Sequence, residues 1–538
     1  MTLTKCLPVL VSGRPSEVMF NLRKWFATLL LPACLLFSPV SSAQSEETVH
    51  NISLAKAASE AVRSNFDIAI ERVRLKTESE KRIIAESEFD SVLGSEVSAG
   101  KTRIANTSAF ASPEVGESDT VSGKVSVSRK SSIGTEYSVS VNTARDFTNS
   151  EFQGLNPSYS GSLNLEITQP LLKGAGADVN KWRIHTSLNN EDMARRQLKI
   201  KLSEVLTSVH ETYWELLFLF ENLKAVQEAL DRAIDHETRI RVQVDVGSMA
   251  PIEIVQAQAF VAANEEDVIE AENLLAHMSD QLLKLTTPHV YDTGMWNVRL
   301  NPIDNPDVAF PAINLDDSVA MALEKRPEIA LLKKEIENKN IELVYLKNQK
   351  WPSLDLVATV THNGVRGRAR GIKSFSTGVE AKSSFGGDYG DAFSDVGSGK
   401  YYNYLVGLRF SYPLGARAGR ASEAVAVYES EEIVLRLKAL ERDIVLEVRD
   451  AVREIESGKK RVKAARYART LAEKKLSAEM KKFEVGASTS FNVLEFQKDL
   501  TAQRTDELRV LAETRKAMAH YQKAVGMALE YNGMEFAE

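Results

Sequence analysis

The chain of 538 residues repeats one plan, and this duplication constrains its fold more than any other feature. Three pairs of segments carry the repeat, in the same order in both halves: LAKAASEAVRSNFDI (54–68) with LDDSVAMALEKRPEI (315–329), QPL (169–171) with YPL (412–414), and VDVGSMAPIEIVQAQ (244–258) with FEVGASTSFNVLEFQ (483–497). Chance similarity between short segments would not preserve that order. We therefore interpret the chain as two copies of one structural unit.

The first 43 residues are expected to be a secretory signal peptide. Arg23 and Lys24 precede an apolar run that ends at Phe37, and a small-residue cleavage pattern ends at Ala43. Met19 lies just upstream of this pattern and is an alternative start. The rest of the chain is then expected to divide into a first repeat (44–300), a linker rich in Asn, Pro and Asp (301–312) and a second repeat (313–538).

Cysteine usage agrees with export. Cys6 and Cys34 both precede Ala43, so the mature chain would contain neither a thiol nor a disulfide. Residues 31–34 (LPAC) resemble a lipoprotein cleavage box, which leaves lipidation of Cys34 open as an alternative. The net charge is −7, and the sequence contains no basic stripe that could neutralise phosphates. Both observations argue against nucleic acid as a partner.

Each repeat contains one long stretch with helical periodicity, 178–243 in the first and 417–482 in the second. Apolar residues recur there on three- and four-residue steps with charged flanks, which is typical of coiled-coil packing. In the first stretch the apolar seam begins at Leu198 and is expected to continue through Leu230 and Ile234. At 1.5 Å per residue, each stretch would form a helix roughly 100 Å long.

A Val-Gly pair follows each long stretch, at Val246-Gly247 and at Val485-Gly486. Glycine between two helical segments predicts a left-handed cap that closes a tight helical hairpin, with both glycines at positive φ. Pro251 suits the first turn of the next helix. The residues of these two hairpin tips are candidate docking positions for a partner: Val246, Gly247, Ser248, Met249, Val485, Gly486, Ala487 and Ser488.

Between the helical stretches, apolar and polar residues alternate with a period of two. Four such segments lie between Phe89 and Pro170, and others lie in 354–360 and 404–412. This pattern is what a strand between lipid and water needs, and it also describes half-buried strands of a soluble sheet.

No motif predicts catalysis, so we expect no enzyme, no cofactor and no metal site. The eight histidines are scattered without metal-ligand spacing, and His210 and His277 are expected to be solvated or capping. The chain has no Gly-x-Ser-x-Gly, no phosphate-binding glycine loop and no cysteine nucleophile.

With NFDI (65–68) and RPEI (326–329) added to QPL, YPL and the Val-Gly turns, the sequence resembles the TolC family of outer-membrane efflux proteins over nearly all of its mature length. The resemblance implies an α+β membrane protein. A homotrimer would form a transmembrane β-barrel from four strands per chain, continued by a periplasmic α-helical coiled-coil barrel. It also implies a passive exit duct of a tripartite efflux pump or type I secretion system. The hairpin tips would dock onto a periplasmic adaptor and, through it, an inner-membrane transporter.

The sequence departs from the family pattern at two places. The first repeat has four strand-like segments where the family needs two, so we assign the membrane-crossing pair to 92–104 and 159–169. The middle hairpin (121–130 and 136–144) would then project outside the cell. The family's acidic gate positions, six and nine residues after the second turn glycine, hold Asn492 and Glu495, and Glu253 occupies the first of these places in the other repeat. The alternative function is a soluble periplasmic coiled-coil scaffold.

Overall fold

The computed structural model describes residues 48–106, 113–288, 298–307, 309–373 and 378–534. The signal peptide expected over residues 1–43, the alternative start and Cys34 lie outside the described residues. The division of the remaining chain into two repeats and a linker stays a prediction, and one strand crosses its boundary at residue 300. This strand, β6 (Val298–Pro302), pairs in parallel with β1 (Thr48–Ile52) near the beginning of the described chain.

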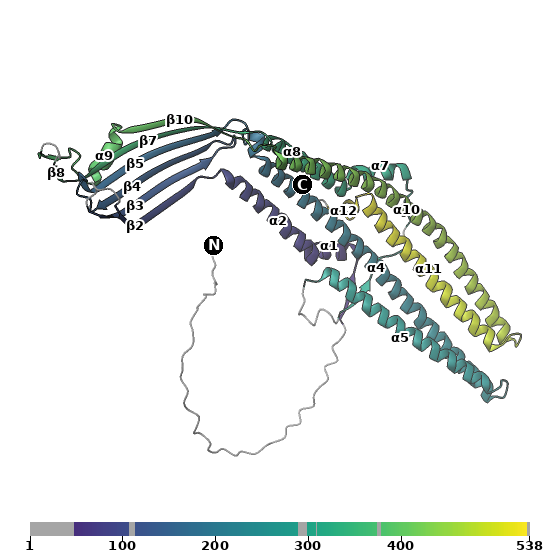
Figure 1. The fold of residues 1–538 in the computed structure, drawn as a ribbon. Coiled ribbons are helices and arrows are strands. Elements are labelled where there is room, and N and C mark those ends of the chain that lie inside the picture. Colours follow the sequence, from purple (N-terminus) through teal and green to yellow (C-terminus); the bar gives the residue numbers. More distant parts are fainter. Residues whose placement is uncertain (1–47, 107–112, 289–297, 308, 374–377, 535–538) are drawn as a thin grey trace, which may run out of the picture. The chain divides into compact units, whose positions relative to one another are not determined.

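A six-stranded antiparallel sheet forms the β part of the fold (Figure 1). Its spatial order is β10-β7-β5-β4-β3-β2, so the two repeats meet between β5 and β7. The strands are β2 (Val92–Ala105), β3 (Val115–Lys130), β4 (Glu136–Thr148), β5 (Leu155–Pro170), β7 (Ser353–Ala369) and β10 (Tyr402–Ser411). A small hairpin of β8 (Gly371–Lys373) and β9 (Glu380–Lys382) precedes β10.

The helices of the two repeats follow the same order. The first repeat has α1 (Leu54–Ser64), α2 (Phe66–Glu86), the short η1 (Ser87–Phe89) and α3 (Ala177–Asn180), α4 (Trp182–Asp245) and α5 (Ile252–Thr286). The second has α7 (Leu315–Lys325), α8 (Pro327–Gln349), α10 (Arg417–Glu484), α11 (Ser490–Ala524) and the short α12 (Ala528–Tyr531). An additional helix, α9 (Tyr389–Ser398), packs on β5 and β7. Within the described ranges, no helix combines the length and apolarity needed to cross a membrane.

Matching residues of the repeated segments occupy matching places. Ala61 and Ala322 are fully buried, and Ile68 and Ile329 lie in the cores of their own repeats. Both short helix pairs break at the same point, because Asn65 caps α2 with its side chain and Pro327 begins α8.

The sequence-based prediction of the buried seam of α4 is wrong at the C-terminal end of the helix. Ile234 is exposed, whereas Ala229, Ala233 and His236 are buried along that part of the helix. His210 is also buried rather than solvated, and its Nε2 lies 2.8 Å from Asn532 Oδ1. Small residues continue the buried seam where α11 packs against α4. A search for large apolar residues at helical spacing does not detect them.

The expected position of the middle hairpin is also wrong. β3 and β4 pair with each other and with β2 and β5 along their lengths, so the sheet has six strands instead of four. Their connecting turn lies at the end of the sheet from which the helices continue: Gly176 N–H donates to the carbonyl of Ile133 at 3.2 Å. Lys130 also pairs with Glu88 at 2.6 Å beside the end of α2. The hairpin is therefore part of the sheet and does not project beyond its far end.

Candidate functional site

The first hairpin tip joins α4 to α5 through a left-handed glycine. Gly247 has φ 78°, its N–H donates to the carbonyl of Val244 at 2.9 Å, and Ser248 N–H donates to that of Gln243 at 2.8 Å. The side chain of Ser248 reaches the same carbonyl at 2.8 Å. This is the hydrogen-bond pattern that closes a helix on glycine.

The second hairpin tip repeats this geometry between α10 and α11. Gly486 has φ 75°, with its N–H donating to Phe483 and that of Ala487 donating to Lys482 at 3.0 and 2.8 Å. Ser488 Oγ donates to Glu479 Oε1 at 2.5 Å, and this bond, with the Lys482 ammonium, lowers the pKa of the Glu479 carboxyl. The positive φ predicted for both glycines is present.

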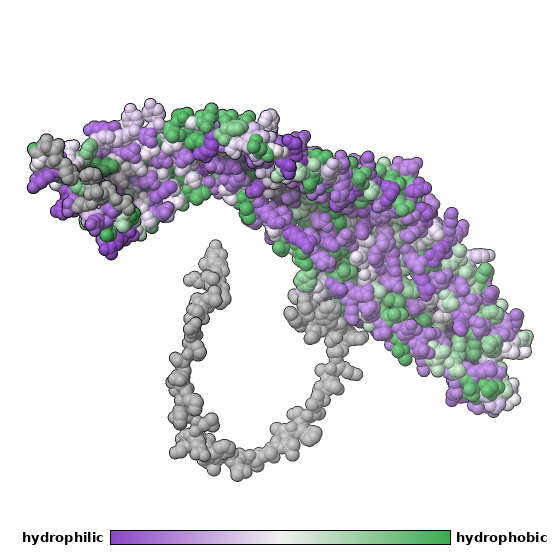
Figure 2. Space-filling view, in the orientation of Figure 1, coloured by the Kyte–Doolittle hydropathy of each residue, from purple (hydrophilic) through white to green (hydrophobic). Residues whose placement is uncertain are grey.

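Both tips expose apolar side chains that the described chain leaves uncovered. Val246 and Ile252 lie at the first tip, 73% and 58% exposed, with the half-buried Met249 between them. Val485 and Phe491 lie at the second, 78% and 62% exposed. Figure 2 shows hydrophobic residues at the end of the α4–α5 hairpin, on helices that are otherwise mostly hydrophilic. Exposed apolar residues gathered at one place indicate a contact surface for another protein.

The three candidate gate residues do not come together within one chain. Glu495 and Asn492 are exposed and lie one turn apart on α11, where Asn492 Nδ2 donates weakly to Ser488 Oγ at 3.4 Å. Glu253 lies at the start of α5, and α4 runs between α5 and α11 (Figure 1). Its Oε2 is buried and has no hydrogen-bond partner among the described residues.

A contact between the two hairpins escaped the sequence analysis. His236 Nε2 of α4 lies 2.8 Å from Ser490 Oγ at the first turn of α11, and both residues are buried. Burial, and secondarily the charge of Arg239, lowers the pKa of this imidazole. The histidine falls on the buried seam, but its partner lies 254 residues away, which periodicity cannot reveal.

The register of the sheet separates an apolar face from a polar face, because directly paired residues point to the same side. The apolar face consists of Leu93, Val97 and Ala99 (β2), Val121, Val125 and Val127 (β3), Tyr137, Val139 and Val141 (β4), Leu163, Leu165 and Ile167 (β5), Leu354, Leu356, Ala358 and Val360 (β7), and Tyr404, Val406, Leu408 and Phe410 (β10). The polar face between them carries mostly Ser, Thr, Asn and charged residues. Figure 2 shows a hydrophobic patch over β10 and the neighbouring strands.

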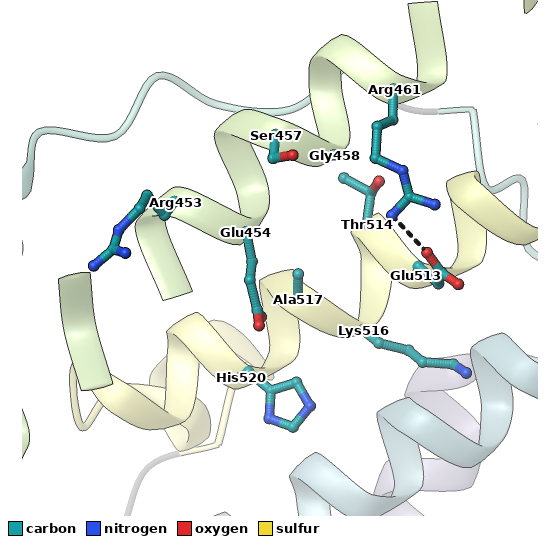
Figure 3. Close-up of a pocket in the computed structure, with 10 residues that line it drawn as sticks. All are labelled: Arg453, Glu454, Ser457, Gly458, Arg461, Glu513, Thr514, Lys516, Ala517 and His520. Atoms are coloured by element: carbon teal, nitrogen blue, oxygen red, sulfur yellow. Dashed lines mark hydrogen bonds and ion pairs between the residues drawn. The ribbon is translucent and has the colours of Figure 1, made fainter. Parts of the chain in front are cut away.

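A groove lies between α10 and α11 (Figure 3). It forms where the helices approach closely: a Cβ on Gly458 would lie 2.6 Å from Thr514 Oγ1. Charged side chains line it, with Arg461 paired to Glu513 at 2.9 Å. His520 Nε2 lies 3.0 Å from a carboxylate oxygen of Glu211 on α4. No group of three or more His, Cys, Asp or Glu within the described ranges is placed to hold a metal ion.

The match to a known family covers much of the second repeat. Residues 319–527 match the family described as outer membrane efflux protein. This part of the chain is therefore similar to the outer membrane efflux proteins. This agrees with the resemblance to the TolC family found in the sequence. No curated protein matches the chain closely enough to be assigned as a relative.

Solved outer-membrane channels share the fold of this chain. CmeC of Campylobacter jejuni is 14% identical, with a TM-score of 0.63 over 88% of this chain and 86% of that one. VceC of Vibrio cholerae is 15% identical, with a TM-score of 0.61 over 88% and 96%. MtrE of Neisseria gonorrhoeae, in its open state, is 14% identical with a TM-score of 0.56 over 88% and 89%. These likenesses confirm the expected α+β fold class.

Proposed function

We propose that this protein is the outer-membrane exit duct of a tripartite efflux pump or a type I secretion system. It would act as a homotrimer and as a passive conduit, without enzymatic activity or cofactor. The observation that carries the proposal is the exposed apolar face of the sheet, set directly beside helical hairpins whose surfaces are mostly polar. A folded chain leaves such a face uncovered only where lipid or another protein covers it.

The pattern along β10 supports lipid as the cover. On the apolar face, Leu408 and Val406 lie between Phe410 on one side and Tyr404 and Tyr402 on the other. Tyr402 and Tyr404 stack with ring centroids 6.2 Å apart. Aromatic residues flanking an aliphatic band are typical of strands in outer-membrane barrels, where the rings lie at the two interfaces.

The free edges of the sheet support assembly into a closed barrel. Among the described residues, β2 and β10 each have a neighbouring strand on one side only. In lipid, each unpaired backbone group would cost several kcal/mol, so further copies must pair with these edges. A trimer satisfies this requirement and would extend the helical hairpins into a periplasmic tube.

The hairpin tips are proposed to dock a periplasmic adaptor, which would connect the duct to an inner-membrane transporter. Their exposed valines, Ile252 and Phe491 support this role. We further propose that Glu495, with Asn492 and Glu253, forms the periplasmic gate. The unpartnered carboxylate oxygen of Glu253 fits a position that gains a contact from a neighbouring copy.

Fractionation of cell envelopes tests this function against the periplasmic scaffold. We expect the protein to remain with the outer membrane through a carbonate wash, because barrel strands are held by lipid. Release into the wash would instead support the scaffold. The apolar face already disfavours that alternative, since α9 covers only its far end on β5 and β7, near Gly161 and Gly364.

A further inference from the structure

We infer that the β3–β4 hairpin spans the membrane, so that each chain contributes six strands and a trimer closes a barrel of eighteen. The inference rests on the proposed function, since it concerns the barrel that function requires. It replaces an external hairpin by two more membrane crossings per chain, and so changes the width of the conduit.

The position of the β3–β4 turn shows that both strands run the full length of the sheet. A Cβ on Gly134, which has φ 93°, would lie 2.5 Å from the carbonyl oxygen of Gly174, between β5 and α3. Arg129 Nε donates to the carbonyl of Phe89 at 3.0 Å, just before β2 begins. An external hairpin would have its turn at the opposite end. Here the turn is held where β2 and β5 join their helices.

The apolar face continues across the hairpin in register with its neighbours. Paired residues place Leu93, Val127, Val139, Leu165 and Val360 in one row across five strands. All five belong to the apolar face, and Val127 and Val139 of the hairpin are as exposed as Leu165 and Val360, at 45, 42, 40 and 42%. A hairpin in water would gain nothing from this match, whereas a lipid-facing band requires it.

The polar face is continuous as well. Ser98 of β2 bonds to Ser122 of β3 at 2.7 Å, and Asn142 of β4 donates to Ser162 of β5 at 3.1 Å. Thr361 of β7 donates to Asn164 of β5 at 2.8 Å, which carries the same side onto the second repeat. The hairpin thus contributes a hydrated wall equivalent to that of the other strands.

The strands of the hairpin are long enough to cross. β3 has 16 residues and β4 has 13, and a tilted membrane strand needs about 9–11. At the far end the apolar face changes to charged residues, with Arg103 paired to Glu117 at 3.2 Å and Lys101 to Asp119 at 3.8 Å. These ion pairs lie where the band would leave the hydrocarbon.

An eighteen-stranded barrel has a wider lumen than four strands per chain would give. Barrel diameter grows roughly linearly with strand number, so the outer-membrane section would be about 1.5 times wider than a barrel of twelve. The edge of β2 in one copy would pair with the edge of β10 in the next, because these are the free edges of the sheet. The occupant of each edge is thus a second copy of this chain.

Spin labels on neighbouring residues test the inference in protein reconstituted into vesicles. Single cysteines replace Val125 and Lys124 on β3, and a second pair replaces Val139 and Ser138 on β4. The control pair replaces Val360 and Thr359 on β7. The chain's own cysteines, Cys6 and Cys34, lie ahead of the expected cleavage site. Collision with oxygen reports lipid, and collision with a water-soluble nickel chelate reports water.

We expect labels at 125, 139 and 360 to favour oxygen, and labels at 124, 138 and 359 to favour the nickel chelate. Nickel access at both members of each hairpin pair, with alternation kept at 359 and 360, would overturn the inference and leave the proposed function intact. Nickel access at both 359 and 360 would contradict the proposed function itself. The β4 pair decides the matter if the β3 variants fail to insert.

Discussion

Gly486 is the residue at which backbone conformation and proposed docking coincide. Its φ of 75° is unfavourable for a residue with a branched Cβ, although no atom lies within 4 Å of the place a Cβ would take. Strain there would therefore come from the backbone and not from crowding, at a cost of about 1–2 kcal/mol. Asparagine adopts this conformation more readily than other side chains.

The first prediction is that Gly486→Val disturbs the tip and reduces export strongly while the barrel assembles normally. Gly486→Asn is the matched control, because it adds a side chain of similar size that tolerates positive φ. Export of a fluorescent dye, crosslinking to the adaptor and the amount of outer-membrane trimer are measured for both variants. Normal export and normal crosslinking in Gly486→Val would disprove the docking role.

The second prediction concerns Glu495, which is exposed on α11 near the second tip. If threefold symmetry gathers three copies at a constriction, their negative charges attract cations and bind multivalent cations tightly. Glu495→Gln should then lower cation selectivity and weaken block by a trivalent cation in single-channel recordings. Asn492→Asp, which adds an acid one turn away, should have the opposite effect. Unchanged selectivity and unchanged block in Glu495→Gln would mean that Glu495 does not line the pore.

The contact of His236 with Ser490 joins the two helical hairpins, α4–α5 and α10–α11. The imidazole stacks obliquely near Phe483, with centroids 5.6 Å apart, and thus contacts α10 as well as α11. Because burial lowers the pKa of this imidazole, the folded state binds fewer protons than the unfolded state between the lowered pKa and the ordinary histidine pKa of 6.5.

The third prediction follows from this difference in proton binding between the folded and unfolded states. The contribution of His236 to stability is complete above about pH 6.5 and is lost as the pH falls toward the lowered pKa of the folded state. The loss is at most about 1.4 kcal/mol per pH unit. His236→Gln should therefore lose less thermal stability than the wild type between pH 7.5 and 5.5, followed by helical circular dichroism. His277→Gln, at an exposed position, is the control. An equal loss in His236→Gln and in the wild type would refute the argument.

The sequence predicted the helices and their turns well because local rules specify them. The three- and four-residue apolar steps correspond to α4 and α10, and the Val-Gly pairs correspond to the two left-handed tips. The seam beyond Ala229 was missed because alanine and histidine pack there against α11. The His236–Ser490 contact depends on the arrangement of two helices, which no local pattern contains.

The strands were predicted individually but not arranged correctly. Alternation fixes which side chains share a face, and the register agrees with it on all six strands. The alternation of apolar and polar residues does not determine at which end of a sheet a turn lies. That position depends on contacts such as Lys130 with Glu88 and Gly176 with Ile133, between segments distant in sequence. An external hairpin and two further sheet strands are therefore indistinguishable from the sequence pattern alone.

At the scale of the whole molecule, the sheet of one chain is open and does not close into a barrel by itself. Within the part of the chain that the structure describes, the sheet has free edges at β2 and β10, and the tips and the apolar face expose residues that no other described residue covers. The duplicated plan gives each repeat strands and one helical hairpin. Rotation of three copies about one axis would bury the free edges and continue both walls into a closed conduit.

The fourth prediction, and the most direct test of this account, is the mass of the protein extracted from outer membranes in mild detergent. Native mass spectrometry should find a complex of three chains, because only a closed ring satisfies the edges of the sheet. Heating should dissociate and unfold the complex into single chains, which is visible as a shift in mobility on a gel. A stable, folded single chain in the same detergent would contradict the trimeric duct.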